Sequence, residues 1–167
     1  MLSPDYYYDS VFMIPYHELQ QRNIKGLIFD LDNTLAPFNI PRPPAKIAAL
    51  VRRLRRMGFI ICLLTNNTEK RMRLFNEHLE AIGVHSAMKP LTGGIKRAMR
   101  LMGTERAETA IIGDQLFSDV WGGRNARIMT ILVKPIGKAD FFTVRMKRGL
   151  EGLFIKAFLK KAGVPAP

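Results

Sequence analysis

A strict alternation of short apolar runs with amphipathic stretches constrains the fold more than any other feature of this sequence. The apolar runs lie at residues 27–29, 59–64, 84–88, 109–113 and 128–133. Helical periodicity fills the intervals, at residues 44–57, up to about 82, at 93–102 and at about 117–125. Continuous apolar strands are typical of a parallel sheet buried on both sides. The pattern predicts an α/β fold: a three-layer Rossmann-like parallel sheet with helices on both faces.

Proline and glycine mark the ends of the expected helices. Pro44 begins the first helix and Gly58 ends it. The second helix, with Met72 and Phe75 on its apolar stripe, is expected to run until Gly83 ends it. Each helix therefore offers one apolar stripe to the sheet.

The length of 167 residues suits one compact domain. We expect a single domain over residues 1–167, with a core at about 26–133 and a basic C-terminal helical appendage at about 138–162. The single cysteine, Cys62, excludes a disulfide framework and favours a reducing compartment. No run reaches the ~18 apolar residues that span a bilayer, and the N-terminus lacks the pattern of a secretory signal. A cytoplasmic protein is therefore expected.

The formal net charge of +12 attracts polyanions, which include nucleic acid, acidic phospholipid surfaces and phosphorylated substrates. Residues 138–161 carry seven basic residues against two acidic ones. Two interpretations of this segment stay open. It is either an interfacial helix that makes the protein peripheral on the inner face of the membrane, or a terminal helix packed on the sheet. Gly149 and Gly152 weaken a free-standing helix and favour the second interpretation.

Polar side chains follow four of the five expected strands, at the edge where open parallel sheets bind their ligands. They are Asp30 and Asp32, then Thr65, Asn66 and Asn67, then Lys89, then Asp114 with Asp119 five residues further on. Carboxylate oxygens of Asp30 and Asp114 suit a hard cation such as Mg²⁺. A carboxylate can also attack phosphorus as a nucleophile, and a second one can move the proton. Thr65 and Lys89 would hold the phosphoryl oxygens.

Four segments resemble the motifs of the haloacid dehalogenase (HAD) superfamily of phosphatases, in the order that the family has them. They read FDLDNTL, LLTNN, MKP and IIGDQLFSD, between about residues 26 and 133. The LDNTL sequence of the first motif, the small size and the basic tail resemble those of the bacterial YqeG family of subclass IIIA. Members of that family are similar to mitochondrial phosphatidylglycerophosphate phosphatases.

The resemblance implies a role for each matching residue. Asp30 corresponds to the nucleophile and Asp32 to the general acid/base. Thr65, Asn66 and Lys89 correspond to phosphate-binding residues, and Asp30, Asp32 and Asp114 to the ligands of Mg²⁺. Asp119 corresponds to a supporting carboxylate that positions the lysine or a metal-bound water. The gaps between the motifs are too short for a cap domain, so an open active site is expected.

Several residues allow a second interpretation. Lys96 competes with Lys89 as the phosphate lysine, although a Lys-Pro pair directly after a strand favours Lys89. Thr34 is expected to shape the turn, Asn67 to be the N-cap of a helix, and Trp121 to lie in the core.

The function expected from these features is Mg²⁺-dependent hydrolysis of a phosphomonoester through an aspartyl-phosphate on Asp30. By resemblance, the substrate is phosphatidylglycerophosphate or another anionic lipid phosphate, with its bulk outside the open site. The same chemistry on nucleic acid or phosphoprotein, and a basic binding module without turnover, remain alternatives. The sequence does not indicate an oligomeric state.

Overall fold

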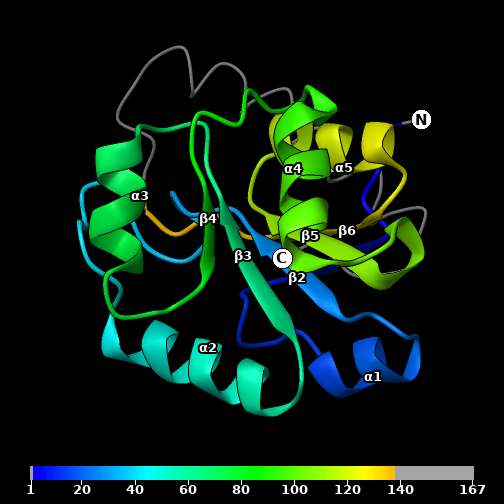
Figure 1. The fold of residues 1–167 in the computed structure, drawn as a ribbon, viewed down its shortest axis with the longest axis horizontal. Coiled ribbons are helices and arrows are strands. Elements are labelled where there is room, and N and C mark those ends of the chain that lie inside the picture. Colours follow the sequence, from blue (N-terminus) through cyan, green and yellow to red (C-terminus); the bar gives the residue numbers. More distant parts are fainter. Residues whose placement is uncertain (1, 138–167) are drawn as a thin grey trace.

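The fold is a six-stranded sheet in which every neighbouring pair of strands is parallel, in a computed structural model that describes residues 2–137 (Figure 1). The order across the sheet is β1-β6-β5-β2-β3-β4. The strands are β1 Tyr6–Tyr8, β2 Gly26–Phe29, β3 Ile60–Leu64, β4 Ile82–Val84, β5 Thr109–Gly113 and β6 Met129–Val133. The predicted parallel α/β architecture is confirmed.

Helices cover both faces of the sheet. The helices are α1 Tyr16–Gln21, α2 Ala45–Arg56, α3 Glu69–Asn76, α4 Thr92–Met102 and α5 Trp121–Ala126. The first three pack in one apolar cluster, against strand residues such as Phe29 and Leu63. The other two pack against the opposite face, where Ile28 and Cys62 point. Because successive strand residues alternate between the faces, these neighbours belong to different layers.

Two further elements, β1 and α1, precede residue 25, in a segment for which no element was expected. Strand β1 pairs with β6 at the edge of the sheet, with Tyr6 opposite Ile131. Asp5 fixes this edge, because its Oδ2 accepts bonds from the backbone nitrogen (2.8 Å) and hydroxyl (2.9 Å) of Thr130. The sheet therefore extends beyond the five expected strands.

The predicted boundary between the second helix and the third strand is wrong. Helix α3 ends at Asn76, and Gly83 lies inside β4. The side-chain amide of Asn76 accepts a bond from the backbone nitrogen of Ala81 (3.1 Å) and donates to its carbonyl oxygen (2.6 Å). This pairing and the left-handed backbone of Glu80 (φ 52°) turn the chain before the expected end of the helix.

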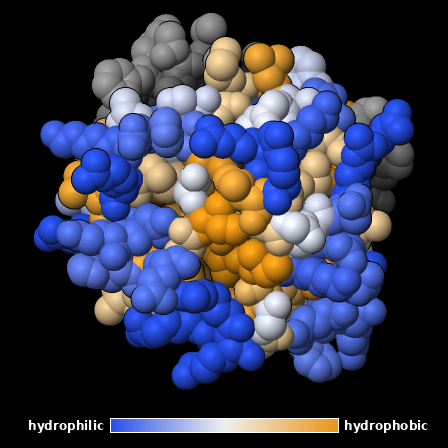
Figure 2. All heavy atoms as spheres, viewed as in Figure 1, coloured by the Kyte–Doolittle hydropathy of each residue, from blue (hydrophilic) through white to orange (hydrophobic). Residues whose placement is uncertain are grey.

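Figure 2, which has the same view as Figure 1, shows an apolar area over β3 and β4 that is surrounded by hydrophilic side chains. Among residues 2–137, no helix combines the length and the apolar character needed to cross a bilayer. The basic helical appendage expected at about residues 138–162 lies outside the described residues.

Candidate active site

The carboxyl ends of three neighbouring strands bring the predicted residues together. Phe29 of β2 pairs with Leu63 of β3 on one side and with Ile112 of β5 on the other, so these strands end in register. The backbone nitrogen of Asp30 continues the pairing with a 2.8 Å bond to the carbonyl oxygen of Ile112. A hollow of about 360 Å³ lies at this edge, lined by Asp30, Asp32, Thr65, Asn66, Asn67, Lys89, Gln115 and Ser118.

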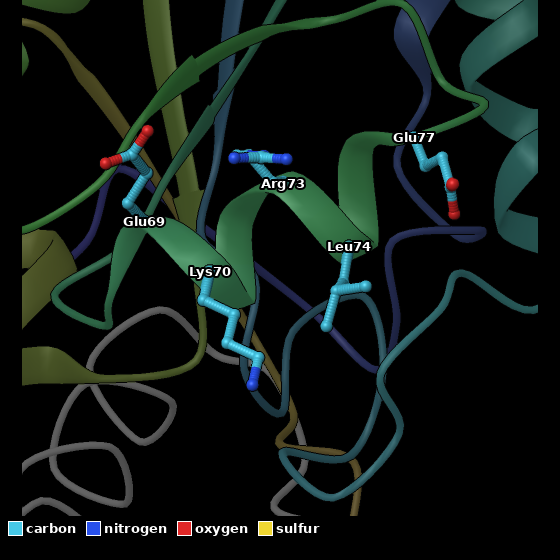
Figure 3. A pocket seen from close by; sticks show the side chains of 5 residues that line it. All are labelled: Glu69, Lys70, Arg73, Leu74 and Glu77. Carbon is cyan, nitrogen blue, oxygen red and sulfur yellow. The ribbon is translucent and has the colours of Figure 1, made fainter.

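A larger hollow, of about 610 Å³, lies elsewhere and lacks this chemistry. Figure 3 shows it along the outer face of α3, lined by Glu69, Lys70, Arg73, Leu74 and Glu77. These side chains are those of a solvated helix face, and their charges are mixed. We therefore take the smaller hollow, with its converging carboxylates, as the candidate active site.

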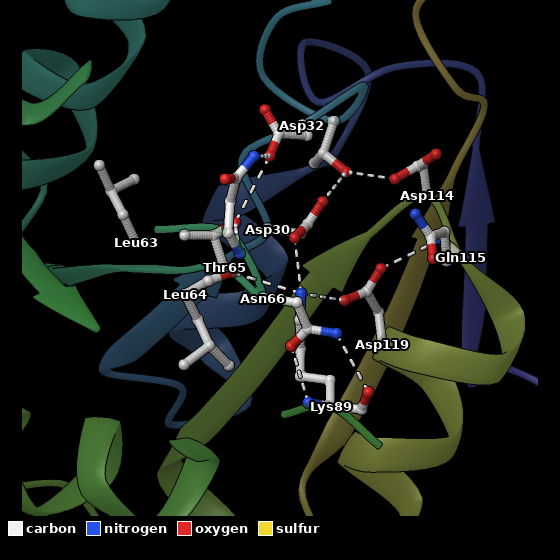
Figure 4. A network of polar contacts seen from close by, with 12 residues as sticks. Asp30, Asp32, Leu63, Leu64, Thr65, Asn66, Lys89, Asp114, Gln115 and Asp119 are labelled. Carbon is white, nitrogen blue, oxygen red and sulfur yellow. Dashed lines mark hydrogen bonds and ion pairs between the residues drawn. The ribbon is translucent and has the colours of Figure 1, made fainter. Parts of the chain in front are cut away.

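Lys89 lies at the centre of the candidate active site (Figure 4). Its Nζ is 2.5 Å from Oδ1 of Asp30 and 2.6 Å from Oδ1 of Asp119, and it donates to the carbonyl oxygen of Leu64 at 3.3 Å. Burial alone would lower the pKa of Lys89, but Asp119 and Asp30 raise it above its ordinary value. Lys89 is therefore a fixed, buried ammonium, whereas Lys96 is exposed on α4.

Asn66 fixes the backbone of Lys89. Its Oδ1 accepts a 2.7 Å bond from the backbone nitrogen of Lys89, and its Nδ2 donates to the carbonyl oxygen of the same residue at 3.1 Å. Both ends of the amide are thus engaged within the protein. The side chain of Asn66 holds the lysine segment in place against the end of β3.

Thr34 links two of the carboxylates. Its hydroxyl oxygen lies 3.2 Å from Oδ2 of Asp30 and 3.1 Å from Oδ1 of Asp114. A hydroxyl has one proton, so it donates to one of the two carboxylates at a time. Thr34 was expected to shape the turn after the strand. Its side chain is buried between two groups of the candidate active site, a contact that sequence spacing did not reveal.

The acidic side chains crowd at the buried end of the site. Oxygens of Asp30, Asp114 and Asp119 lie within 4.8 Å of one another. The pKa of Asp30 is raised to about 7, mainly by burial and also by the neighbouring charge of Asp119, against the opposing effect of Lys89. One ammonium thus faces three buried carboxylates, and a divalent cation would balance the excess negative charge. Asp32, also expected as a metal ligand, has its carboxylate outside this group of three.

Asp32 points toward the start of α3 instead. Its Oδ1 accepts bonds from Nε (3.1 Å) and Nη2 (3.0 Å) of Arg71. Its Oδ2 accepts a 3.2 Å bond from Nδ2 of Asn67 and lies 3.5 Å from the hydroxyl of Thr65. The N-cap of α3 is Thr68, whose hydroxyl accepts from the backbone of Arg71, so the N-cap role expected for Asn67 is wrong.

Sequence reasoning missed Arg71 because the sequence places it in an ordinary amphipathic helix. The available signal was that Arg71 lies in the first turn of the helix that directly follows the polar end of β3, so that a long basic side chain there starts close to the site.

No cap domain lies between the motifs in this part of the chain. A loop, α2 and β3 separate Asp32 from Thr65, and α3 and β4 separate Thr65 from Lys89. The loops after β2 and β4 carry four exposed large apolar side chains, namely Phe38, Ile40, Met88 and Leu91, and a fifth, Trp121, is the first residue of α5. The expectation that Trp121 lies in the core is wrong, since it is 46% exposed. The neighbouring Gly122 packs toward Pro90 and Ile95, which leaves the indole outside.

Comparison with known proteins identifies the family of enzymes to which this chain belongs. Residues 39–127 match a family model described as haloacid dehalogenase-like hydrolase. The HAD phosphatase of Thermococcus onnurineus has the same fold, with a TM-score of 0.57 and 12% identity over 71% of this chain and 90% of that one. The chain belongs to the haloacid dehalogenase-like hydrolases, and the expected assignment to HAD-type phosphatases is confirmed.

Two relatives refine this placement. The chain is 34% identical to the protein named "Probable phosphatase YqeG" of Bacillus subtilis, over 96% of this chain and 94% of that protein. It is 30% identical to phosphatidylglycerophosphate phosphatase 1 of Arabidopsis thaliana, over 91% of this chain. The match spans 47% of the length of the Arabidopsis protein. The expected similarity to YqeG proteins is confirmed.

Proposed function

We propose that this protein is a Mg²⁺-dependent phosphomonoesterase that acts through an aspartyl-phosphate on Asp30, in a single capless domain. The observation that carries the proposal is the position of Asp30, with one oxygen on Lys89 and the other on Thr34. Lys89 and Thr34 fix the carboxylate of Asp30 at the end of β2. A phosphoryl group that enters the hollow would meet an oriented nucleophile and a permanent positive charge.

The donor set fits Mg²⁺. Hard cations prefer carboxylate oxygens, and Mg²⁺ usually combines one or two carboxylates with water and phosphate oxygens. Asp30 and Asp114 supply such oxygens on either side of Thr34. When bound, the cation would neutralise the phosphate and favour the ionised form of Asp30, whose pKa burial raises to about 7.

The proposed reaction has two steps. In the first, a carboxylate oxygen of Asp30 bonds to phosphorus while the ester P–O bond breaks, and the leaving oxygen takes the proton of the Asp32 carboxyl group. In the second, Asp32 accepts a proton from water as the water oxygen bonds to phosphorus. The bond between phosphorus and Asp30 then breaks, which releases phosphate and restores both aspartates.

We further propose that the substrate is an anionic lipid phosphate, with phosphatidylglycerophosphate as the first candidate. The similarity to phosphatidylglycerophosphate phosphatase 1 of Arabidopsis supports this substrate, and so does the absence of a cap between the motifs in residues 30–119. The exposed apolar side chains on the surrounding loops add a surface that acyl chains or a bilayer would cover.

A turnover screen tests the proposal. Phosphate release is measured with phosphatidylglycerophosphate in vesicles, a 5′-phosphorylated oligonucleotide, a phosphopeptide and p-nitrophenyl phosphate, each with Mg²⁺ or with excess chelator. We expect Mg²⁺-dependent release, fastest with the lipid. Preference for the oligonucleotide or the phosphopeptide would refute the lipid assignment, and absence of release from every substrate would refute the phosphomonoesterase.

A further inference from the structure

Among residues 2–137, Arg71 is the one cationic side chain that forms an ion pair with Asp32. We propose that Arg71 is a positioning residue, which holds the Asp32 carboxyl group in the orientation that both proton transfers require. This inference rests on the acid/base role proposed above for Asp32.

The contacts of Asp32 define one orientation. Arg71 places two nitrogens on the same oxygen, Oδ1, and leaves Oδ2 to the neutral donors Asn67 and Thr65. The Arg71 side chain is 10% exposed and that of Asp32 is 20% exposed. An ion pair at this depth is less weakened by water than a surface pair, and its two bonds restrict rotation of the carboxyl group. Because Arg71 occupies Oδ1, the proton of the acid form is assigned to Oδ2, whose partners are neutral.

The other side of the guanidinium is held independently of Asp32. Its Nη1 donates to the carbonyl oxygen of Ile40 at 2.5 Å, and its carbon lies 5.2 Å from the centre of the Phe75 ring. Arg42, in the same Pro-rich loop as Ile40, pairs with Glu77 at 3.2 Å. The loop after β2 is thus attached to α3 at Arg71 and to the C-cap residue of that helix at Glu77, and Arg71 is the side chain that orients Asp32.

Lysine cannot replace this arrangement. Three nitrogens of one planar group contact Asp32 and Ile40 in fixed directions, whereas an ammonium is a single point of charge. Without Arg71, Asp32 would keep two neutral donors and gain freedom to rotate. Attack by Asp30 would persist for substrates whose leaving group needs no proton, because Lys89 and Thr34 hold Asp30 through separate contacts.

The two steps can be separated by rapid-quench kinetics on the full chain with Mg²⁺. With p-nitrophenyl phosphate, the leaving group departs without a proton. In Arg71→Met, the attack by Asp30 should therefore remain fast in the first turnover, and hydrolysis of the phosphoryl-enzyme should be slow. We expect a burst of nitrophenol, with steady-state turnover reduced about 10- to 100-fold, part of the ~10²–10⁴-fold that acid–base catalysis supplies. With an alkyl phosphate, the same variant should show slow turnover and no burst.

Matched variants control for general damage. Arg73→Met removes a neighbouring arginine whose side chain lies on the outer face of α3 (Figure 3), and it should behave as the wild type. Arg71→Lys keeps the charge and should be intermediate. Adding Arg71→Met to Asp32→Asn should cause little further loss, because the arginine acts through that carboxylate.

The outcomes separate the two proposals. If Asp30→Asn and Asp32→Asn turn over like the wild type, the proposed mechanism is wrong. If those variants lose activity while Arg71→Met and Arg71→Lys match the wild type, the positioning role alone is wrong. Equal losses of burst and steady-state rates in Arg71→Lys, with an unchanged melting temperature, would also overturn it.

Discussion

The side chain of Asp119 occupies the space that a side chain on Gly113 would need. A Cβ built on Gly113 would lie 2.2 Å from Cγ and from Oδ2 of Asp119, closer than any real contact. The carboxylate reaches this place because the turn at Leu116–Val120 carries it back to the end of β5. From there it holds Lys89 through Oδ1 (2.6 Å) and accepts from the backbone nitrogen of Gln115 through Oδ2 (3.1 Å).

Gly113→Ala should therefore inactivate the enzyme by displacing Asp119 from Lys89. We expect a loss of at least about 10²-fold in kcat/KM for p-nitrophenyl phosphate, since the lysine and its support act as a unit. Gly93→Ala is the matched control, because a Cβ there meets nothing within 4 Å and alanine favours a helix. Wild-type turnover in Gly113→Ala would show that the position of Asp119 is irrelevant to catalysis.

Asp30→Asn should abolish turnover, because an amide is a poor nucleophile. Asp32→Asn should slow turnover by about 10²–10⁴-fold while phosphoryl-enzyme accumulates from an aryl phosphate. Acid quenching after reaction with radiolabelled p-nitrophenyl phosphate measures the protein-bound label. Label on Asp32→Asn but not on Asp30→Asn is the expected result, and equal label on both variants would contradict the assignment of the nucleophile.

The edge of the sheet that carries the site could be predicted from the sequence. Parallel strands end on one side, so the residues directly after each apolar run had to meet there, as Asp30, Thr65 and Asp114 do. Lys89 could be preferred over Lys96 because it follows a strand closely. At these positions the residue type and its place directly after a strand both indicate the site, so the sequence alone is enough to predict them.

Other features depend on contacts that spacing does not encode. The end of α3 is set by the side chain of Asn76 binding the backbone of Ala81, which overrides an apolar stripe that continues to residue 82. Arg71 reaches Asp32 across 39 residues of sequence. Trp121 is a large aromatic residue of the kind often found in a core, but the close packing of Gly122 against Pro90 leaves its side chain exposed.

Removal of the divalent cation should silence the enzyme. Three crowded carboxylates repel one another and the incoming phosphate unless a cation is bound. Excess chelator should stop phosphate release, Mg²⁺ should restore it, and Asp114→Ala should raise the Mg²⁺ concentration needed for half-maximal rate at least about 10-fold. Full activity in chelator would remove the metal from the mechanism.

The stability of the metal-free protein should fall as the pH rises from about 4 to about 7. Burial raises the pKa of Asp30 from 3.8 to about 7, so within this window the folded protein keeps a proton that the unfolded chain has lost. Linkage then lowers the free energy of unfolding, by at most about 4 kcal/mol in total, with no further loss from this group above pH 7. Thermal melts in chelator should show a smaller slope for Asp30→Asn, and stability that rises over this range would refute the shift.

The apolar side chains beside Lys89 should matter for lipid and not for soluble substrates. Met88 and Leu91 are exposed on the loop that carries the lysine, and burying one such side chain fully in a bilayer contributes about 1.5–3 kcal/mol. Met88→Ser with Leu91→Ser should lower flotation with phosphatidylglycerol vesicles, and hydrolysis of phosphatidylglycerophosphate in them, at least about 10-fold. Hydrolysis of p-nitrophenyl phosphate should be unchanged.

Leu101→Ser provides the matched control, because Leu101 is a 52% exposed leucine on α4. Leu101 lies near the C-terminal end of α4, whereas Leu91 precedes its first residue. The neighbouring Met102 packs near Gly26, at the start of β2 and therefore at the edge of the sheet away from the site. Only the variants beside Lys89 should lose lipid activity if the mouth of the site faces the membrane. Equal loss in Leu101→Ser, or vesicle binding that the Met88→Ser, Leu91→Ser variant retains in full, would show that this edge does not contact lipid.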